Sequence, residues 1–341
     1  MKNSLSLKIS KKIYFINFNQ DKSCFIVGTD EGYEIYNTDP FKKIVSKKFG
    51  KLGICYAVML FRTNILGLIR KNTHTEDRNE NILTIWDDSN MKKIGDIEFN
   101  EKIKTVLLRK DFVVISLLQE IYIYNLETLK LFRHIKTHLN VRGIVNCTYD
   151  SQFLLACLSK HSNKTLCIYN ILDETQKTIK IDAHKSEITY LKFSDSGNLL
   201  ATSSEKGTLI RLYHTLTGDL IKELRRGSEQ ISIDWMEFSQ TDKMILCRSK
   251  KGTIHLFNID INNHLPSRKN KKFSFGSMFK QILPKYFSSE WGFAHFHFPH
   301  KKTISIFTKD LKHIIVVDFQ GMYYKINFAT NDYVTITREH L

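Results

Sequence analysis

The chain has 341 residues, of which 42% are hydrophobic, and a formal net charge of +16. This length suits one large domain or two ordinary ones, and this charge favours an anionic partner such as a phosphoinositide membrane or a nucleic acid. The start, MKNSLSLKISKK, lacks the apolar run of a secretory signal, and no stretch approaches the ~18 apolar residues of a membrane-spanning helix. We therefore expect a cytoplasmic protein whose membrane contacts are peripheral.

A short segment recurs along the chain, with alternating apolar residues, an aromatic residue, and then Asn, Asp or His. The clear copies are GYEIYNT (32–38), ILTIWDD (82–88), EIYIYNL (120–126), TLCIYNI (165–171), TLIRLYHT (208–215) and TIHLFNI (253–259), and MYYKINF (322–328) is a weaker one. The aligned aromatic residues of the first six copies are separated by 50, 38, 45, 44 and 44 residues. This spacing is typical of the blades of WD-type β-propellers.

Each copy follows a second apolar stretch that ends in small or polar residues, such as GNLLATSSEKG before 208–215. The pattern predicts a strand, a turn and a strand, rich in β-branched and aromatic residues. A β-solenoid would need a shorter repeat, and two sandwiches would need a linker that the chain lacks. We predict an all-β, seven-bladed WD-type propeller that forms a single domain over 1–341.

Two features of the second repeat need no functional explanation. The polar insertion at 71–81 is interpreted as a flexible hairpin loop. Trp86 and Asp87 form a true WD dipeptide, which is interpreted as a strand-end aromatic followed by a turn former. The six cysteines include no C-x-x-C pair, so we expect reduced, mostly buried thiols.

Two adjacent arginines, Arg225 and Arg226, lie in the sequence LRRG at 224–227. Neighbouring side chains of a strand point to opposite faces, so the two guanidinium groups would enter different pockets, and each can grip a phosphate with paired N–H donors. The loops SSEKGTLIR (203–211) and RSKKGTIHL (248–256) flank the motif, and each supplies hydroxyls, a Lys and a Gly-Thr turn. The pattern predicts two similar anion sites.

A long connection separates the sixth and seventh repeats, with about 25 residues more than a blade requires, near 260–290. The segment 264–289 has six Lys or Arg residues and no acid. Its apolar residues recur at helical spacing and are Phe275, Met278, Phe279, Ile282 and Leu283. A basic amphipathic helix that inserts into a membrane interface fits this pattern. A basic disordered loop, or an apolar segment that covers the propeller, remains the alternative.

Three histidines, His295, His297 and His300, lie in HFHFPH. The first two would share a strand face, but no Cys or carboxylate accompanies them at ligand spacing. We interpret them as solvent-facing strand histidines and expect neither a metal nor a cofactor. The chain has no G-x-S-x-G, P-loop or H-E-x-x-H motif, so we predict that it is not an enzyme.

Taken together, these segments resemble the PROPPINs, β-propellers that bind phosphoinositides in autophagy and endosomal traffic. The resemblance runs along nearly the whole chain, and its strongest matches are FNQDKSCF (18–25), YNTDPFK (36–42), MLFRTN (59–64), IWDD (85–88), AHKSEI (183–188), SEKGTLIRLY (204–213), LRRG (224–227) and LPKYFSSEW (283–291). The last match, and LRRG in place of FRRG, look most like the WD-repeat-domain forty-five and yeast homologous-with-swollen-vacuole branch.

The resemblance implies two phosphoinositide sites on the rim of blades five and six. The implied ligands are phosphatidylinositol 3-phosphate and phosphatidylinositol 3,5-bisphosphate. By motif, the first site would contain Arg225, His184, Ser203, Lys206, Thr208 and Arg211. The second would contain Arg226, Gly227, Ser249, Lys251, Thr253 and His255. The family's blade-six loop inserts into the bilayer, which favours membrane insertion of 264–289.

The resemblance also implies a monomeric adaptor that is recruited to autophagosomal precursor, endosomal or vacuolar membranes. A lipid-transfer protein of autophagy would dock near Asn19 and Asp21. Departures from the family pattern lie near the second site: Arg248 and Lys250 add charge that could strengthen phosphate binding or shift the preference to the bisphosphate, and Glu229 could weaken binding.

Two other classes of function stay open. A nucleic-acid-binding propeller would explain the charge, but it would want aromatic residues interleaved with arginines across a groove. The basic residues concentrate instead in one loop and one rim, so no nucleic acid is expected. A lipid-independent WD-repeat scaffold explains the fold and leaves the paired arginines without a role.

Overall fold

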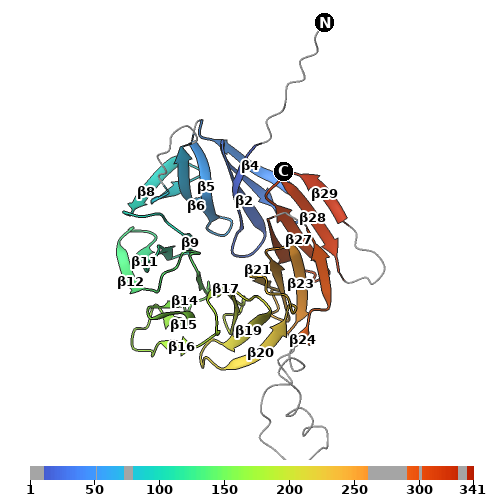
Figure 1. Ribbon diagram of the computed structural model, residues 1–341. Helices are drawn as coiled ribbons and strands as arrows, with labels where there is room; N and C mark the ends of the chain where they lie inside the picture. Colours follow the sequence, from blue (N-terminus) through green and yellow to red (C-terminus); the bar gives the residue numbers. More distant parts are fainter. Residues whose placement is uncertain (1–10, 51, 73–79, 260–289, 299–301, 329–335) are drawn as a thin grey trace, which may run out of the picture.

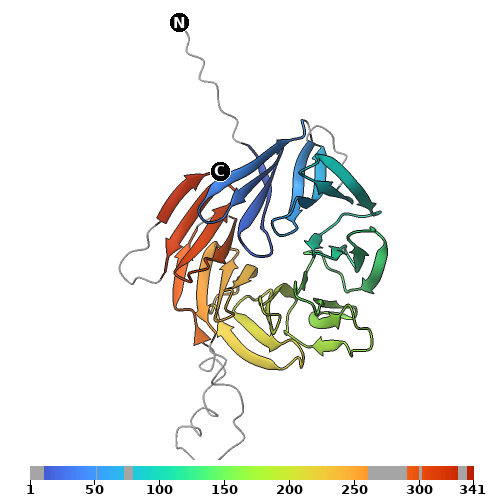
Figure 2. The ribbon, with the colours of Figure 1, turned by 180° about the vertical axis from the view of Figure 1, so that it is seen from behind.

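The computed structural model describes residues 11–50, 52–72, 80–259, 290–298, 302–328 and 336–341, which form seven β-sheets in a ring around a central axis (Figures 1 and 2). Blade one contains β1 (Ile13–Phe18), β2 (Cys24–Thr29), β3 (Gly32–Asn37) and β4 (Lys42–Lys48). Blade two contains β5 (Leu52–Met59), β6 (Ile65–Asn72), β7 (Ile82–Asp87) and β8 (Lys92–Glu98). Blade three contains β9 (Thr105–Leu108), β10 (Phe112–Ser116), β11 (Glu120–Asn125) and β12 (Leu131–Lys136).

The other four blades continue the same order around the ring. Blade four contains β13 (Val145–Cys147), β14 (Leu154–Ser159), β15 (Ser162–Asn170) and β16 (Ile179–Ile181). Blade five contains β17 (Ile188–Phe193), β18 (Leu199–Ser204), β19 (Leu209–His214), β20 (Leu220–Arg225) and the later strand β24 (Glu290–Trp291). Blade six contains β21 (Ile233–Phe238), β22 (Met244–Ser249), β23 (Thr253–Asn258) and β25 (Ala294–His297), and blade seven contains β26 (Thr303–Phe307), β27 (His313–Asp318), β28 (Met322–Asn327) and β29 (Ile336–His340).

The recurring sequence segments are the third strands of the seven blades, β3, β7, β11, β15, β19, β23 and β28. The predicted seven-bladed, all-β propeller is therefore confirmed. The polar insertion connects β6 to β7, and its residues 73–79 lie outside the described part of the chain. The long connection of blade six joins β23 to β24, and the predicted insertion residues lie within 260–289, also outside the described residues.

The core lies between the blades. Each of seven hydrophobic clusters joins two neighbouring sheets, and the cluster between blades five and six, for example, combines Leu224 with Phe238 and Phe257. Second strands such as β10, β14 and β18 are buried at every position, because a neighbouring blade covers each face. The outermost strand β4, with the sequence KKIVSKK, is mostly exposed.

The ring closes through side chains between blade one and blade seven. The Phe41 ring stacks on Tyr323, with 4.4 Å between centroids, and the Tyr323 hydroxyl donates to the carbonyl of Thr38 at 3.0 Å. Lys325 and Asp39 form an ion pair of 2.8 Å. Among the described strands, no ladder of backbone hydrogen bonds links the two sheets, so packing holds this joint together.

Two interpretations from the sequence are confirmed, one of the cysteines and one of the WD dipeptide. All six cysteines are free thiols, and all but Cys55 are buried. Trp86 is buried, while the Asp87 carboxylate accepts hydrogen bonds from Asn64, Ser89 and Asn90 in the turn. Within the described ranges, no helix has the length and apolar character needed to span a membrane.

Candidate anion-binding sites

Arg225, the last residue of β20, and Arg226, which follows it, face different neighbouring blades. Directly opposed residues of an antiparallel pair share a face, and Arg225 lies opposite Leu209, two residues from the pair Arg211 and Glu223. On that face the adjoining Tyr213 packs against blade four. The intervening Leu224 packs against blade six, and Arg226 follows on its side. The alternation expected from the sequence therefore holds where β20 ends.

The face of blade five toward blade four, here called the first site, brings together several of its predicted residues. His184 Nε2 lies 2.9 Å from Thr202 Oγ1, and the Arg211 Nη1 group donates to the Ala183 carbonyl at 2.6 Å. Burial, together with the Arg211 charge, lowers the pKa of His184 to about 3, so this imidazole is neutral at pH 7. Arg225 is half-buried on the same face.

The remaining predicted residues of the first site are placed differently. Lys206 is exposed in the turn between β18 and β19, where Thr208 is half-buried. Ser203 is fully buried on the opposite face of β18, with its hydroxyl 3.3 Å from that of Thr189. The hydroxyl that meets His184 belongs instead to its neighbour Thr202, which the motif did not single out.

The first site also contains an acid that the sequence did not suggest. Glu223 Oε2 accepts a hydrogen bond from Arg211 Nε at 2.9 Å. Part of the charge of Arg211 is therefore neutralised in the free protein. Arg225, on the same face, and the exposed Lys206 are the other cations near this site.

Arg226 is buried, and backbone carbonyls hold its guanidinium in position. Its Nε donates to Gly207 at 3.0 Å, and its Nη2 donates to Glu229 at 2.6 Å and Ile231 at 3.0 Å. Among the residues that the structure describes, Nη1 has no hydrogen-bond partner. An arginine that is fixed through two nitrogens and leaves a third available is pre-organised for an anion.

The turn before β19 needs a glycine to accept this arrangement. Gly207 has a φ of +59°, and a Cβ atom there would lie 1.8 Å from the Ile231 carbonyl oxygen, which is itself an acceptor for Arg226. The Gly-Thr turn recognised in the sequence thus lets two backbone segments meet around the guanidinium.

The face of blade six toward blade five supplies the second site. Thr253 and His255 are half-buried on β23, Ser249 is buried at the end of β22, and Lys251 is exposed in the turn between them. Burial, with the charge of Arg226 and then that of His295, lowers the pKa of His255 to about 4. Gly227 is half-buried beside Arg226, and a Cβ atom at this position would meet no heavy atom within 4 Å.

Two charged residues near the second site are already paired. Lys251 forms an ion pair with Glu229, and each side chain is 60% exposed. Such an exposed pair contributes little, so an incoming phosphate can compete for the lysine. Glu229 is thus the acid close to this site, as the sequence suggested.

The expectation that Arg248 adds charge to the second site is wrong. Arg248 is buried, and its Nη1 group donates to both carboxylate oxygens of Asp234, at 2.6 and 2.5 Å. The strand alternation of β22 places Arg248 on the face opposite Ser249, so its charge is both directed away and neutralised. Lys250, in contrast, is exposed in the following turn.

Strand β24 brings the long connection back beside Arg225. It pairs in parallel with β20, so that Trp291 lies opposite Arg225 and Glu290 lies opposite Leu224. Trp291 and Phe293 are 52% and 46% exposed. The connection thus leaves from blade six and returns next to the first site (Figure 1). Two exposed aromatic rings lie at its end.

The histidines of β25 lie next to the second site, which the sequence did not reveal. His295 and His297 are exposed, as predicted, and His300 lies outside the described residues. His295 is opposite His255, and His297 is opposite Thr253. The described residues contain no cluster of three or more His, Cys, Asp or Glu side chains suited to a metal ion.

The segment 18–25 mainly ties the ring together. Asn19 is buried, donates to the Phe61 carbonyl at 3.1 Å and accepts from the Cys24 amide at 3.0 Å. Asp21 is exposed and accepts from the Ser23 amide and hydroxyl. Of the two residues expected to dock a partner, Asp21 is therefore the accessible one.

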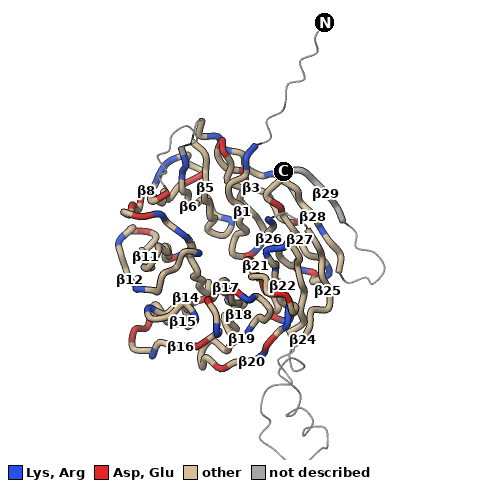
Figure 3. Tube along the Cα trace, viewed as in Figure 1, with Lys and Arg blue, Asp and Glu red and all other residues tan. Residues whose placement is uncertain are grey.

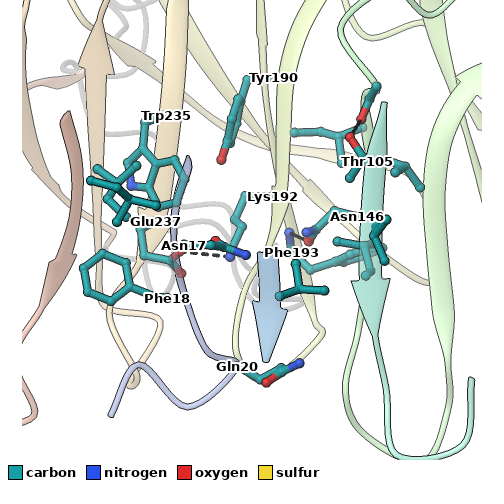
Figure 4. A pocket seen from close by; sticks show the side chains of 18 of the residues that line it. Asn17, Phe18, Gln20, Thr105, Asn146, Tyr190, Lys192, Phe193, Trp235 and Glu237 are labelled. Atoms are coloured by element: carbon teal, nitrogen blue, oxygen red, sulfur yellow. Dashed lines mark hydrogen bonds and ion pairs between the residues drawn. The ribbon is translucent and has the colours of Figure 1, made fainter. Parts of the chain in front are cut away.

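The central channel encloses a cavity of about 780 Å³ lined by the inner strands (Figure 4). Inside it, Glu237 forms ion pairs with Lys22 at 3.0 Å and Lys192 at 2.9 Å, and Lys22 also pairs with Asp195 at 2.9 Å. Burial alone would raise the pKa of Glu237, but the two lysines outweigh it and lower this pKa. These groups satisfy one another, so we interpret them as a structural clasp, defined as Lys22, Lys192, Asp195 and Glu237.

Seven β-sheets arranged in a ring, with basic residues on both faces of blade five, define a WD-type β-propeller. The PROPPIN family model matches residues 12–288. Autophagy-related protein 18e of Arabidopsis thaliana is 32% identical over 331 residues, which cover 95% of this chain and 86% of that protein. The chain belongs to the PROPPIN family, as its motifs predicted.

A second relative agrees with this assignment, and two solved structures share the fold. Autophagy-related protein 18 of Dictyostelium discoideum is 29% identical and covers 94% of this chain and 90% of that protein. The structure of Kluyveromyces lactis Hsv2 with a complete loop 6CD has a TM-score of 0.78, at 24% identity over 97% of this chain and 99% of that one. A complex of KlAtg21 with the coiled-coil of AgAtg16 has a TM-score of 0.74, at 24% identity and the same coverage.

Proposed function

We propose that this protein is a non-enzymatic, peripheral membrane adaptor of autophagy or endolysosomal traffic. It recognises phosphatidylinositol 3-phosphate and phosphatidylinositol 3,5-bisphosphate through the first and second sites. The observation that carries the proposal is the divergence of Arg225 and Arg226 onto the two faces of blade five. We expect each arginine to bind its phosphate together with hydroxyl groups, a turn lysine and an imidazole, which different strands and turns supply for the two sites.

The chemistry of both pockets suits a phosphate monoester. Guanidinium groups donate paired N–H bonds to phosphate oxygens, and charge-assisted hydrogen bonds of this kind contribute roughly 1.5–3 kcal/mol each. One such site gives only weak binding. Two sites on one rigid blade engage two headgroups of the same membrane, so that the second binding event becomes intramolecular.

The rim geometry supports docking on edge. The connection at 260–289 starts from blade six and ends beside Arg225, so both arginine sites flank the segment that we expect to insert into the bilayer. Trp291 and Phe293 add exposed aromatic rings next to it, and such rings favour the membrane interface. A monomer docked this way keeps the loop between β1 and β2 in blade one, which contains the exposed Asp21, free for a lipid-transfer protein.

The names of the relatives support the cellular part of the proposal. Two of them are called autophagy-related proteins, and a similar propeller has been solved with a coiled-coil of another such protein. We propose recruitment from the cytoplasm to autophagosomal precursor, endosomal or vacuolar membranes. In Figure 3, Asp and Glu are interspersed with Lys and Arg around the described ring, which disfavours a continuous nucleic-acid track.

A liposome panel that varies only the inositol phosphate pattern tests the proposal. Vesicles with matched total charge would carry phosphatidylinositol, its 3-, 4- or 5-phosphate, or its 3,5- or 4,5-bisphosphate. We expect co-sedimentation at least about tenfold stronger with the 3-phosphorylated lipids than with their charge-matched isomers, a difference of about 1.4 kcal/mol. Equal binding to all isomers would leave only non-specific attraction, and silence on every vesicle would favour the protein scaffold.

The insertion loop has its own test, Phe279→Asp. We expect this variant to leave vesicles about tenfold faster, because removing a buried aromatic ring from the acyl boundary forfeits roughly 1.5–3 kcal/mol. Binding of soluble inositol 1,3-bisphosphate should stay unchanged. Stopped-flow dissociation and calorimetry measure the two quantities.

Ser277→Asp is the matched control for this loop variant. It adds the same charge outside the predicted apolar stripe and should have the smaller effect on dissociation. A loss of soluble headgroup binding in Phe279→Asp would show that the loop supports the propeller instead of entering the membrane.

A further inference from the structure

Strand β25 places two histidines on the wall of the second site. His297 Nδ1 lies 3.0 Å from the hydroxyl of Thr253, and the rings of His295 and His255 are 6.3 Å apart, between centroids, with an interplanar angle of 32°. These contacts follow from the register of β23 and β25, which pairs Thr253 with His297 and His255 with His295. Three imidazoles therefore lie on one face of blade six.

This face is turned toward the Arg226 pocket. The alternate residues of β25, Ala294 and Phe296, pack against the core between blades six and seven, so the histidines point to the other side. On β23, the neighbouring Phe257 shares the face of His255 and packs against blade five. The charge of Arg226 acts directly on His255. The histidine cluster and the guanidinium thus border the same space.

The charges around the cluster favour an anion and disfavour a metal. The ionisable groups that face it are Arg226 after β20, Glu229 in the following loop, Cys247 on β22, Lys251 in the turn, His255 on β23, and His295 and His297 on β25. Glu229 is the only carboxylate among them in the described residues, and it pairs with Lys251. Among the described residues, no carboxylate outside this ion pair therefore faces the histidines to stabilise a protonated imidazole in the free protein.

We propose that His295 and His297 extend the second site onto β25 and bind the phosphate as imidazolium groups, so that anion binding at this site takes up protons. The proposal rests on the proposed function, because it assumes that Arg226 binds a phosphate monoester. It assigns two ligand residues that the arginine motif and its flanking loops do not contain. It also makes the second site, with three imidazoles, respond more strongly to pH than the first, where His184 is the imidazole.

The direction of the pH dependence follows from linkage. In the free protein, burial and the neighbouring Arg226 and His295 charges lower the pKa of His255 to about 4, and a bound phosphate dianion reverses the sign of the local potential. An imidazole whose pKa rises on binding takes up a proton, so affinity increases as the pH falls toward that raised pKa. The phosphate itself has a second pKa of about 6, and its own protonation opposes the effect.

The first site is the control for protonation of the phosphate itself, because both sites bind the same ligand. Arg225→Ala leaves the second site to be measured, and Arg226→Ala leaves the first, with the same ligand in both. Calorimetry with inositol 1,3-bisphosphate at pH 7.5 and 5.5, in buffers of different ionisation enthalpy, gives affinity and proton uptake. We expect the second site to gain about tenfold in affinity relative to the first over this range, with net proton uptake.

His295→Gln/His297→Gln in the Arg225→Ala background should remove that relative gain and most of the proton uptake. Both side chains are exposed, so the variant should fold, and its thermal melting verifies this. An unchanged pH response in this variant would overturn the proposal. If neither single-arginine variant nor the wild type binds the headgroup at either pH, the proposed function fails, whereas pH-independent binding at both sites refutes only the proton coupling.

Discussion

Replacing Arg225 and Arg226 together with alanine should reduce binding to vesicles that contain phosphatidylinositol 3-phosphate by about a hundredfold or more. Each guanidinium contributes roughly 1.5–3 kcal/mol through charge-assisted hydrogen bonds to phosphate, and about 1.4 kcal/mol corresponds to a factor of ten. Each single variant should lose less than the double variant, because one site still holds the protein on the membrane. Co-sedimentation against lipid concentration measures all three.

The controls for this result follow from the structure. Lys42→Ala/Lys47→Ala removes two charges from β4, in blade one, and should bind almost as well as the wild type. Arg226 also holds three backbone carbonyls, so its loss costs stability. Lys206→Glu/Lys251→Glu changes only exposed turn residues and should weaken binding without unfolding. Persistent selective binding in both double variants would refute the site assignment.

Replacing Glu237 with alanine should cause the largest loss of stability. The side chain is buried and lies between Lys22 and Lys192, so its removal leaves two cations facing the cavity without their shared partner. Breaking a buried ion pair by removing one partner typically costs about 3–5 kcal/mol. We expect a lower midpoint in denaturant and a fall in Tm on the order of 5 °C or more.

Glu229→Ala is the matched control for the clasp. It removes an acid from an ion pair whose two side chains are each 60% exposed, and exposed pairs contribute about 0–1 kcal/mol. Glu237→Ala should still bind phosphoinositide vesicles at low temperature, because the clasp lies in the channel and not on the rim. A Glu237→Ala protein as stable as Glu229→Ala would mean that water, and not Glu237, balances the two lysines.

The fold was predictable because its signal repeats. Seven third strands carry the same alternation and a similar spacing, and one blade cannot bury its faces alone. The divergence of Arg225 and Arg226 was also predictable, since a strand of any register sends adjacent side chains to opposite faces. These conclusions need no knowledge of which blade lies against which.

The residues that sequence reasoning missed or misplaced could be located only with the strand register and the pairing of distant strands. Arg248 and Ser249 are neighbours, and only the register of β22 decides which of them faces blade five. His295 and His297 meet β23 across the long connection after Ile259, so no local pattern fixes their pairing. Glu223 lies one strand away from Arg211, and an ion pair across two strands leaves no signature in the linear sequence.

The joint between blades one and seven determines how the ring would respond to force. Hydrogen-bonded strands loaded along their length must break many bonds together, whereas packed side chains separate a few at a time. Because the described joint consists of packing around Phe41 and Tyr323 with one side-chain hydrogen bond and one ion pair, a load applied across it would open this seam before any sheet is sheared. In a propeller anchored to a membrane through blades five and six, this seam lies one blade away from the anchor, since blade seven packs against blade six, so opening there would leave both lipid-binding blades folded.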